Sequence, residues 1–209
     1  MFNIGDKIVY PMHGAGIIEG IEEKEILGEK RKYYMMKMPI GDMKVMIPVD
    51  NVEEIGIREI IDEEELEKVL DILQGDKTKM PQNWNRRYRV NMEKIKSGDI
   101  FEIAAVVRNL MLRDAEKGLS TGERKMLNSA KQMLISEIVL VSNSDQEETE
   151  KRIDDAINSA WNFWSLCYII LDYGNKYIKG GELMFDKIMR GIISLLGLLI
   201  GYGLAVELK

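Results

Sequence analysis

SGDIFEIAAVVRNLMLRDAEKGLSTGERKMLNSAKQMLISEIVLV, residues 97–141, is the stretch that decides the fold. It contains two helix starts, because Asp99 is followed by Glu102 and Ser120 by Glu123, which is the spacing of a capping box. Apolar residues follow each start at helical spacing. The stretch therefore predicts two amphipathic helices that pack in one core.

The helical pattern continues on both sides of this stretch. Asp62 is followed by three glutamates, and the helix macrodipole favours acids in a first turn. A second helix is expected to open at Pro81–Trp84. Ser144 and Glu147 form a third capping box for a last helix. We expect a compact all-α domain over residues 61–158.

Residues 1–60 show a β-type pattern instead. Short β-branched and aromatic runs alternate with turn residues, and Gly28 and Gly41-Asp42 mark hairpins. Four or five short strands at this spacing predict a small, strongly bent sheet or partial barrel. The predicted fold class is therefore α+β with two domains, a β domain over 1–60 and the helical domain after it.

The composition argues against most enzyme classes and metal sites. The chain has 209 residues with one Cys and one His, which excludes a disulfide framework and a Cys-cluster metal site. It contains no GxxxxGK[ST], HExxH or GxSxG motif. His13 lies beside a Gly14–Gly16 turn without a third glycine, so a structural role is favoured over ligand binding. We predict a cytoplasmic protein that is not an enzyme and holds no cofactor or metal.

The charge is unevenly distributed along the chain. The net charge is −6, yet residues 77–136 carry 13 basic and 6 acidic side chains. Such a segment is typical of a surface that meets a polyanion, although a solvated helical face is the alternative interpretation. Its Asn83–Arg89 run places Trp84 among arginines. This run predicts either a nucleic-acid edge, with an indole wedge and phosphate clamps, or a core Trp with solvated arginines.

Several blocks of sequence resemble one known family. In chain order they are Gly5–Gly16, Ile47–Val52, Gly56–Arg58, Asn83–Arg89, Lys96–Asp99, Ala105–Leu110 and Gly118–Leu127. Over residues 1–157 their order and spacing are similar to those of the CarD/CdnL family of bacterial transcription regulators. The resemblance implies a Tudor-like N-terminal domain, shared with transcription–repair coupling factors, that docks on the RNA polymerase β subunit. It also implies a helical domain on promoter DNA at the upstream edge of the bubble.

The resemblance also implies contact residues on both surfaces. Trp84 would be a minor-groove wedge that hinders bubble closure. The implied DNA contacts are Trp84, Arg86, Arg87, Arg89, Arg124 and Lys125. The implied polymerase contacts are Lys24, Lys44, Met46 and Pro48. Met46 stands where several relatives have Arg, so a more apolar contact is implied there. Because the protein is acidic overall, binding to free DNA is expected to be weak, and the polymerase tether would supply the missing affinity.

Residues 159–209 depart from this pattern. Only 9 charged side chains occur in 161–209, and residues 191–206 form an apolar run slightly short for a membrane helix. Lys179–Met184 can be encoded by a ribosome-binding sequence followed by a start codon. One hypothesis is therefore that residues from about 159 to 183 are translated intergenic DNA, and that residues 184–209 are the start of the next gene product. The other is a genuine apolar tail, and the alternative function is then a membrane-tethered interaction protein.

Overall fold

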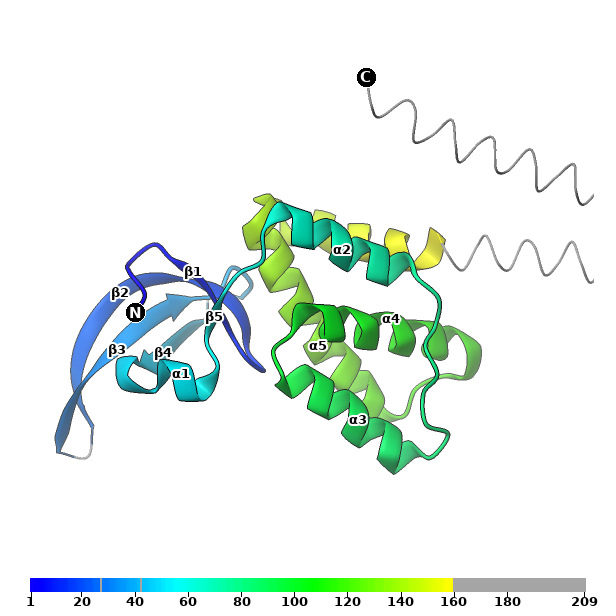
Figure 1. The fold of residues 1–209 in the computed structure, drawn as a ribbon, viewed down its shortest axis with the longest axis horizontal. Helices are drawn as coiled ribbons and strands as arrows, with labels where there is room; N and C mark the ends of the chain where they lie inside the picture. Colours follow the sequence, from blue (N-terminus) through cyan, green and yellow to red (C-terminus); the bar gives the residue numbers. More distant parts are fainter. Residues whose placement is uncertain (27, 42, 160–209) are drawn as a thin grey trace, which may run out of the picture. The chain divides into compact units, whose positions relative to one another are not determined.

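The computed structural model describes residues 1–26, 28–41 and 43–159. An antiparallel sheet is followed by a set of helices, as Figure 1 shows, and this confirms the predicted α+β class. The apolar run 191–206 and Lys179–Met184 lie outside the described residues. Among the residues that are described, no helix is long and apolar enough to cross a membrane.

The sheet has five strands in the order β4-β3-β2-β1-β5, and every neighbouring pair is antiparallel. The strands are β1 (Lys7–Tyr10), β2 (Gly14–Ile26), β3 (Glu29–Lys37), β4 (Lys44–Pro48) and β5 (Arg58–Glu59). A 3-10 turn η1 (Val49–Asn51) and a short helix α1 (Val52–Ile55) connect β4 to β5. Gly28 and Gly41 take positive φ at the two hairpins, as their sequence positions predicted.

One face of the sheet carries the core of this domain. Strand alternation places alternate side chains on opposite faces, and one face buries Ile8, Ile18, Tyr34, Met36 and Ile47. The register shifts between Ile18 and Gly20, which marks a β-bulge in the long, curved β2. The opposite, outer face of the β2–β4 part carries the residues that the sequence predicted for polymerase contact.

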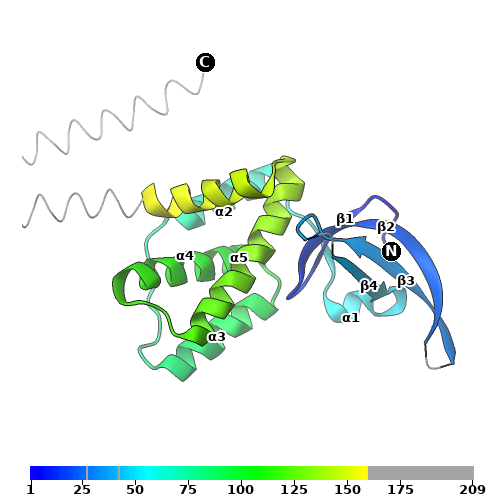
Figure 2. The same cartoon turned by 180° about the vertical axis from the view of Figure 1, so that it is seen from behind.

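The helical domain contains four long helices between residues 63 and 142. They are α2 (Glu63–Gln74), α3 (Trp84–Lys96), α4 (Ile100–Lys117) and α5 (Thr121–Ser142). Residues 146–159 form a further helix at the end of the described chain. Figures 1 and 2 both show α3 on one side of α4, with α2 and the 146–159 helix on the other. Apolar side chains from all five helices form one continuous core.

The helix starts follow the predicted signals with two corrections. Asp62 and Ser120 each form a complete capping box, with Glu65 and Glu123 respectively. Asp99 caps α4 by accepting from Phe101 N, but no capping box forms with Glu102.

The two corrections have local causes. Glu102 is instead hydrogen bonded to Lys94 on α3, so the α3–α4 corner competes for its carboxylate. The last helix begins one residue later than predicted. Asp145, and not Ser144, accepts from a first-turn amide, that of Glu148 at 2.8 Å, while the Ser144 hydroxyl bonds to Thr149.

The last helix is held against its neighbours by ion pairs. Lys131 on α5 contacts Glu150 at 3.0 Å and Asp154 at 2.8 Å. Burial acts to lower the pKa of Lys131, but hydrogen bonds and charge from the two carboxylates raise it above its usual range. Arg152 lies 3.5 Å from Glu67 on α2. Helix α2 and the 146–159 helix therefore meet on the side of the domain away from α3.

The sheet and the helices share a polar seam. The Ala15 amide donates to Ser136 Oγ on α5 at 2.8 Å, and a Cβ on Gly14 would lie only 2.5 Å from that oxygen. Gly14 has φ +105°, so glycine is required there for conformation as well as for space. At the other end of β1, Lys7 Nζ donates to the Leu140 carbonyl at 2.6 Å.

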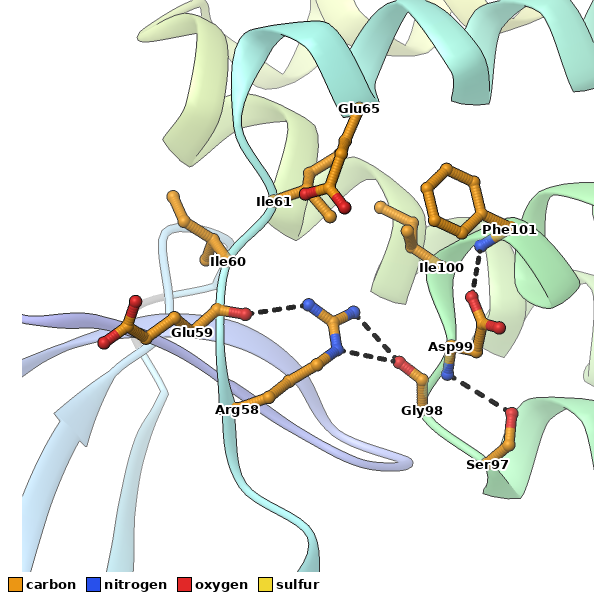
Figure 3. A pocket seen from close by; sticks show the side chains of 10 residues that line it. All are labelled: Arg58, Glu59, Ile60, Ile61, Glu65, Ser97, Gly98, Asp99, Ile100 and Phe101. Carbon is orange, nitrogen blue, oxygen red and sulfur yellow. Dashed lines mark hydrogen bonds between the residues drawn. The ribbon is translucent and has the colours of Figure 1, made fainter. Parts of the chain in front are cut away.

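Arg58 forms the strongest link across this seam. Its guanidinium donates two bonds to the Glu137 carboxylate, at 2.6 and 2.9 Å, and two to the Gly98 carbonyl. Figure 3 shows the side chain extended toward Gly98, beside the Asp99 cap of α4. Glu137 also accepts from the Ile61 amide at 3.1 Å. One buried carboxylate on α5 thus ties the β5 strand and the start of the helical domain together.

Candidate nucleic-acid interface

Trp84 is the first residue of α3 and is exposed on the surface. The Asn83 side chain caps the helix by accepting from the Arg86 amide at 3.1 Å. The indole is 46% exposed, which is uncommon for a side chain of this size in a well-packed domain. This exposure excludes the alternative interpretation of Trp84 as a core residue.

The indole is held in one place by the start of α5. Its Nε1 donates to Ser120 Oγ at 2.9 Å, and its ring centroid lies 6.0 Å from that of Tyr88. A Cβ on Gly122 would come within 3.9 Å of the Trp84 ring and 3.8 Å of the Tyr88 ring. The two rings therefore lie close over the first turn of α5. This turn and Tyr88 contact one part of the indole, and the rest of the indole stays exposed.

Arg87 does not face the solvent. The sequence predicted a phosphate contact, but the side chain is 3% exposed and its Nε donates to Glu123 at 2.6 Å. Its Nη1 donates to the Pro81 and Gln82 carbonyls just before α3. The guanidinium is therefore bonded to one carboxylate and two carbonyls and is not available to a phosphate, so the prediction for Arg87 is wrong.

Glu123 links the buried arginine to the exposed tryptophan. It is the third residue of the α5 capping box, and its carboxylate accepts from the Ser120 hydroxyl at 2.8 Å. Burial acts to raise the pKa of Glu123, but hydrogen bonds from Arg87 and Ser120 and the charge of Arg87 hold it below its usual range. Hydrogen bonds thus run without a break from Arg87 through Glu123 and Ser120 to the indole of Trp84.

The remaining predicted DNA contacts are exposed side chains on the same two helices. Arg86 and Arg89 lie on α3, and Arg124 and Lys125 lie in the first turns of α5. Arg124 is 3.3 Å from Asp114, with more than half of its side chain exposed. Helices α3 and α5, which carry and support Trp84, therefore each have two of these exposed cations in their N-terminal halves.

The predicted polymerase contacts lie on one face of the sheet. Met46 pairs with Met35 and Pro48 with Tyr33, while Lys24 pairs with Arg31 farther along the β2–β3 hairpin. Because directly paired residues point to the same face, all three belong to the outer face.

The same outer face includes Lys44, which pairs with Lys37 in the sheet. Lys44 Nζ also contacts Glu19 at 2.7 Å, and Lys24 contacts Glu22 at 3.2 Å. Met46 is 45% exposed on β4, the edge strand. The structure therefore joins the four predicted positions into one surface of mixed apolar and cationic character.

Two further features are His13, for which the sequence favoured a structural role, and a cavity at the seam. The His13 ring lies 4.4 Å from the Tyr10 ring. A cavity of about 370 Å³ lies along the seam between Arg58 and Phe101 (Figure 3), but its arginine is committed to Glu137 and Gly98. Among the described residues, no three His, Cys, Asp or Glu side chains form a group that could hold a metal ion.

Sequence reasoning missed the residues that support the indole. Tyr88 follows Trp84 at i, i+4, a spacing that predicts contact on a helix surface. The contact with Ser120 spans 36 positions, and no local pattern reports it. Arg87, Asn91 and Ile95 are all buried and spaced by four, so Arg87 lies on the packed face of α3, but two of these three residues are polar and the sequence shows no apolar stripe there.

Comparison with known proteins gives two family matches and close relatives. Residues 68–154 match the family described as CarD, C-terminal domain, and residues 2–61 match the CarD-like/TRCF RID domain. The Bacillus subtilis (strain 168) protein named "Putative transcription factor YdeB" is 47% identical over 153 residues, which cover 73% of this chain and 97% of that protein. The solved structure of CdnLNt from Myxococcus xanthus is 41% identical and covers 30% of this chain and 89% of its own, with a TM-score of 0.27.

Proposed function

Because this chain belongs to the CarD family of bacterial transcription regulators, we propose that it docks on the RNA polymerase β subunit and stabilises the promoter open complex. The sheet would bind the polymerase, and the exposed ends of α3 and α5 would bind DNA at the upstream edge of the bubble. The observation that carries this proposal is Trp84, a large indole that is exposed and oriented on a helix that also carries the exposed Arg86 and Arg89.

The chemistry of the α3–α5 surface suits DNA. Apolar wedges inserted between base steps kink and unstack a duplex from the minor groove, while nearby cations bind phosphates. Trp84 supplies the wedge, and Arg86, Arg89, Arg124 and Lys125 supply the cations. If each of these four side chains neutralises one phosphate, few counterions are released, so affinity for free DNA is expected to be weak and to fall as the salt concentration rises.

The outer face of the sheet suits a protein partner. Met35, Met46 and Pro48 provide an apolar centre, with Lys24 and Lys44 at its edges. Strand β4 lies at the edge of the sheet, where backbone groups are available to pair with an added strand. A sheet edge of this kind can bind the polymerase through its backbone as well as through these side chains.

The energy that the mechanism requires is small. A tenfold shift of the open–closed equilibrium needs about 1.4 kcal/mol of differential affinity. Stacking of one aromatic ring on a base supplies about 1–3 kcal/mol. A single wedge that contacts only the opened state is therefore sufficient, provided that the polymerase tether raises its local concentration.

The first experiment measures open-complex lifetime with the full chain, cognate polymerase and a ribosomal-type promoter. We expect the wild type to lengthen the lifetime and Trp84→Ala to lose most of that effect while still binding polymerase. Arg89→Ala should weaken the effect in part. Lys151→Ala removes an exposed cation from the 146–159 helix and serves as the matched control. An unchanged lifetime with Trp84→Ala would contradict the wedge.

A second experiment tests the polymerase surface. Met46 and Ile21 are both 45% exposed, and they lie on opposite faces of the sheet. We expect Met46→Asp to abolish capture of polymerase by the full chain, because a charge would be placed in an apolar contact. Ile21→Asp should leave capture intact. Equal effects of the two variants would rule out the outer face as the docking surface.

A further inference from the structure

A groove runs beside Trp84 along the contact between α3 and α5. Its volume is about 170 Å³, and it is lined by Met12, Tyr88, Met92, Ile95, Gly122, Lys125, Met126 and Ser129. Trp84, Tyr88 and Met92 follow one another at i, i+4 and i+8, so they form a continuous apolar strip on α3. Tyr88 and Gly122 belong both to the groove and to the support of the indole. The groove is thus continuous with the candidate DNA surface.

Met12 reaches this groove from the β domain. It lies in the β1–β2 loop, is 42% exposed and has φ +68°, a left-handed conformation that is uncommon for a methionine. Strained backbone of this kind persists only where surrounding contacts enforce it.

The neighbours of Met12 provide those contacts. Pro11 packs where a Cβ on Gly98 would lie, at 3.2 Å, and Gly14 is held against Ser136 on α5. The loop is therefore fixed on both sides of Met12, and the side chain is presented at the groove.

We propose that the groove binds the deoxyribose–phosphate backbone of the DNA strand next to the wedge, and that Met12 makes it a composite site built by both domains. This inference rests on the proposed function and deepens it. The apolar faces of the sugars would lie on Tyr88, Met92 and Met12, and a phosphate would contact Lys125.

The charge and the length of the groove support this occupant. None of its lining residues is acidic, and its rim carries Lys125. From Trp84 to Met92 the helix rises about 12 Å, at 1.5 Å per residue. That length corresponds to roughly three to four nucleotide steps of 3.4 Å. A wedged strand would therefore pass along the groove and reach Met12 within a few nucleotides.

Site-directed cleavage of DNA tests the position of Met12. Cys167, the only cysteine, is replaced by serine in the full chain, and an iron-chelate probe is attached at Met12→Cys, Arg89→Cys or Ile26→Cys. Ile26 is also 42% exposed but lies at the end of β2, so it is the matched control. In the open complex with polymerase we expect promoter cleavage from positions 12 and 89, a few nucleotides apart, and none from position 26.

The outcomes separate the groove from the wedge. Cleavage from position 89 but not from position 12 would overturn the groove and leave the proposed function intact. Cleavage from neither position would contradict DNA binding by α3, and with it both proposals. Cleavage of a polymerase subunit alone from position 12 would show a protein occupant and overturn the groove. Equal cleavage of DNA from position 26 would also overturn it, because the contact would then not be localised.

A functional variant gives an independent readout. Met12→Asp places a negative charge where the backbone would pass, and should reduce the gain in open-complex lifetime by roughly three- to tenfold. Met12→Leu should retain that gain, and Ile26→Asp should have no effect. If Met12→Asp matches the wild type while Trp84→Ala loses activity, the groove is excluded and the wedge remains.

Discussion

Helix α5 carries two buried carboxylates that bind arginines in two different regions. Glu123, in the first turn, accepts from Arg87, and the two side chains are 2% and 3% exposed. Glu137, about four turns later, accepts from Arg58, with exposures of 3% and 31%. The first pair lies entirely inside the helical domain under Trp84, and the second lies in the seam with the sheet.

The two pairs differ in how far burial keeps water away from the arginine, and this difference sets the cost of breaking each pair. Both arginines also bond to backbone carbonyls, but loss of the partner would leave Arg87 without access to water, whereas Arg58 is partly solvated. Removing one member of a fully buried pair is far more costly than breaking a solvated one. The pair under Trp84 therefore fixes the candidate DNA surface rigidly, and the seam pair joins the sheet with a weaker link.

Glu123→Ala should have the largest effect on stability. We expect the free energy of unfolding of the full chain to fall by about 3–5 kcal/mol, because Arg87 becomes an uncompensated buried charge. Urea denaturation measures the change. Arg86→Ala, which alters an exposed neighbour of Arg87, should change the stability by less than about 0.5 kcal/mol.

Glu137→Ala should cost less, about 1.5–3 kcal/mol, since it removes charged hydrogen bonds but leaves Arg58 with solvent and the carbonyls of Glu59 and Gly98. It should also speed proteolytic cleavage between β5 and α2, because the Ile61 amide loses its acceptor. If this variant is as unstable as Glu123→Ala, partial solvation of Arg58 does not make the seam pair cheaper to break than the fully buried pair.

Acid should weaken the pair under Trp84. The folded state holds the pKa of Glu123 below its ordinary value of 4.5, so the unfolded state binds the proton more readily. Its contribution to stability is complete above the unfolded pKa and is lost as the pH falls through the folded one. Each unit of depression is worth about 1.4 kcal/mol. Denaturation curves for wild type and Glu123→Gln between pH 7 and pH 3 should converge as the pH falls.

Ser120→Ala should have the smallest effect on stability, about 1 kcal/mol, from loss of the α5 N-cap. It should release the indole from its hydrogen bond and reduce the effect on open-complex lifetime more than this loss of stability explains. Ser144→Ala removes a hydroxyl before the last helix and is the control, because Asp145 supplies that cap. Equal activity of Ser120→Ala and wild type would show that the indole needs no fixed orientation.

The sequence predicted the elements well because their signals are local. Capping residues, glycines and apolar spacing located the helices and the hairpins to within a few residues. The errors arose where a side chain had a partner elsewhere in the fold. Glu102 turned to Lys94, and Arg87 turned inward to Glu123, 36 positions away. A run of arginines predicts charge, but only the packed structure decides which of them reaches the surface.

Helix α5 also fixes a distance within the molecule. Its residues from Glu123 to Glu137 span about 21 Å, and each end is bonded to a different part of the molecule. On the proposed mode of binding, this rigid length holds the support of the wedge at a fixed distance from the seam with the sheet, whose β2–β4 part carries the polymerase surface. The position of action on a promoter would then be measured from the polymerase, without any need for sequence-specific base contacts.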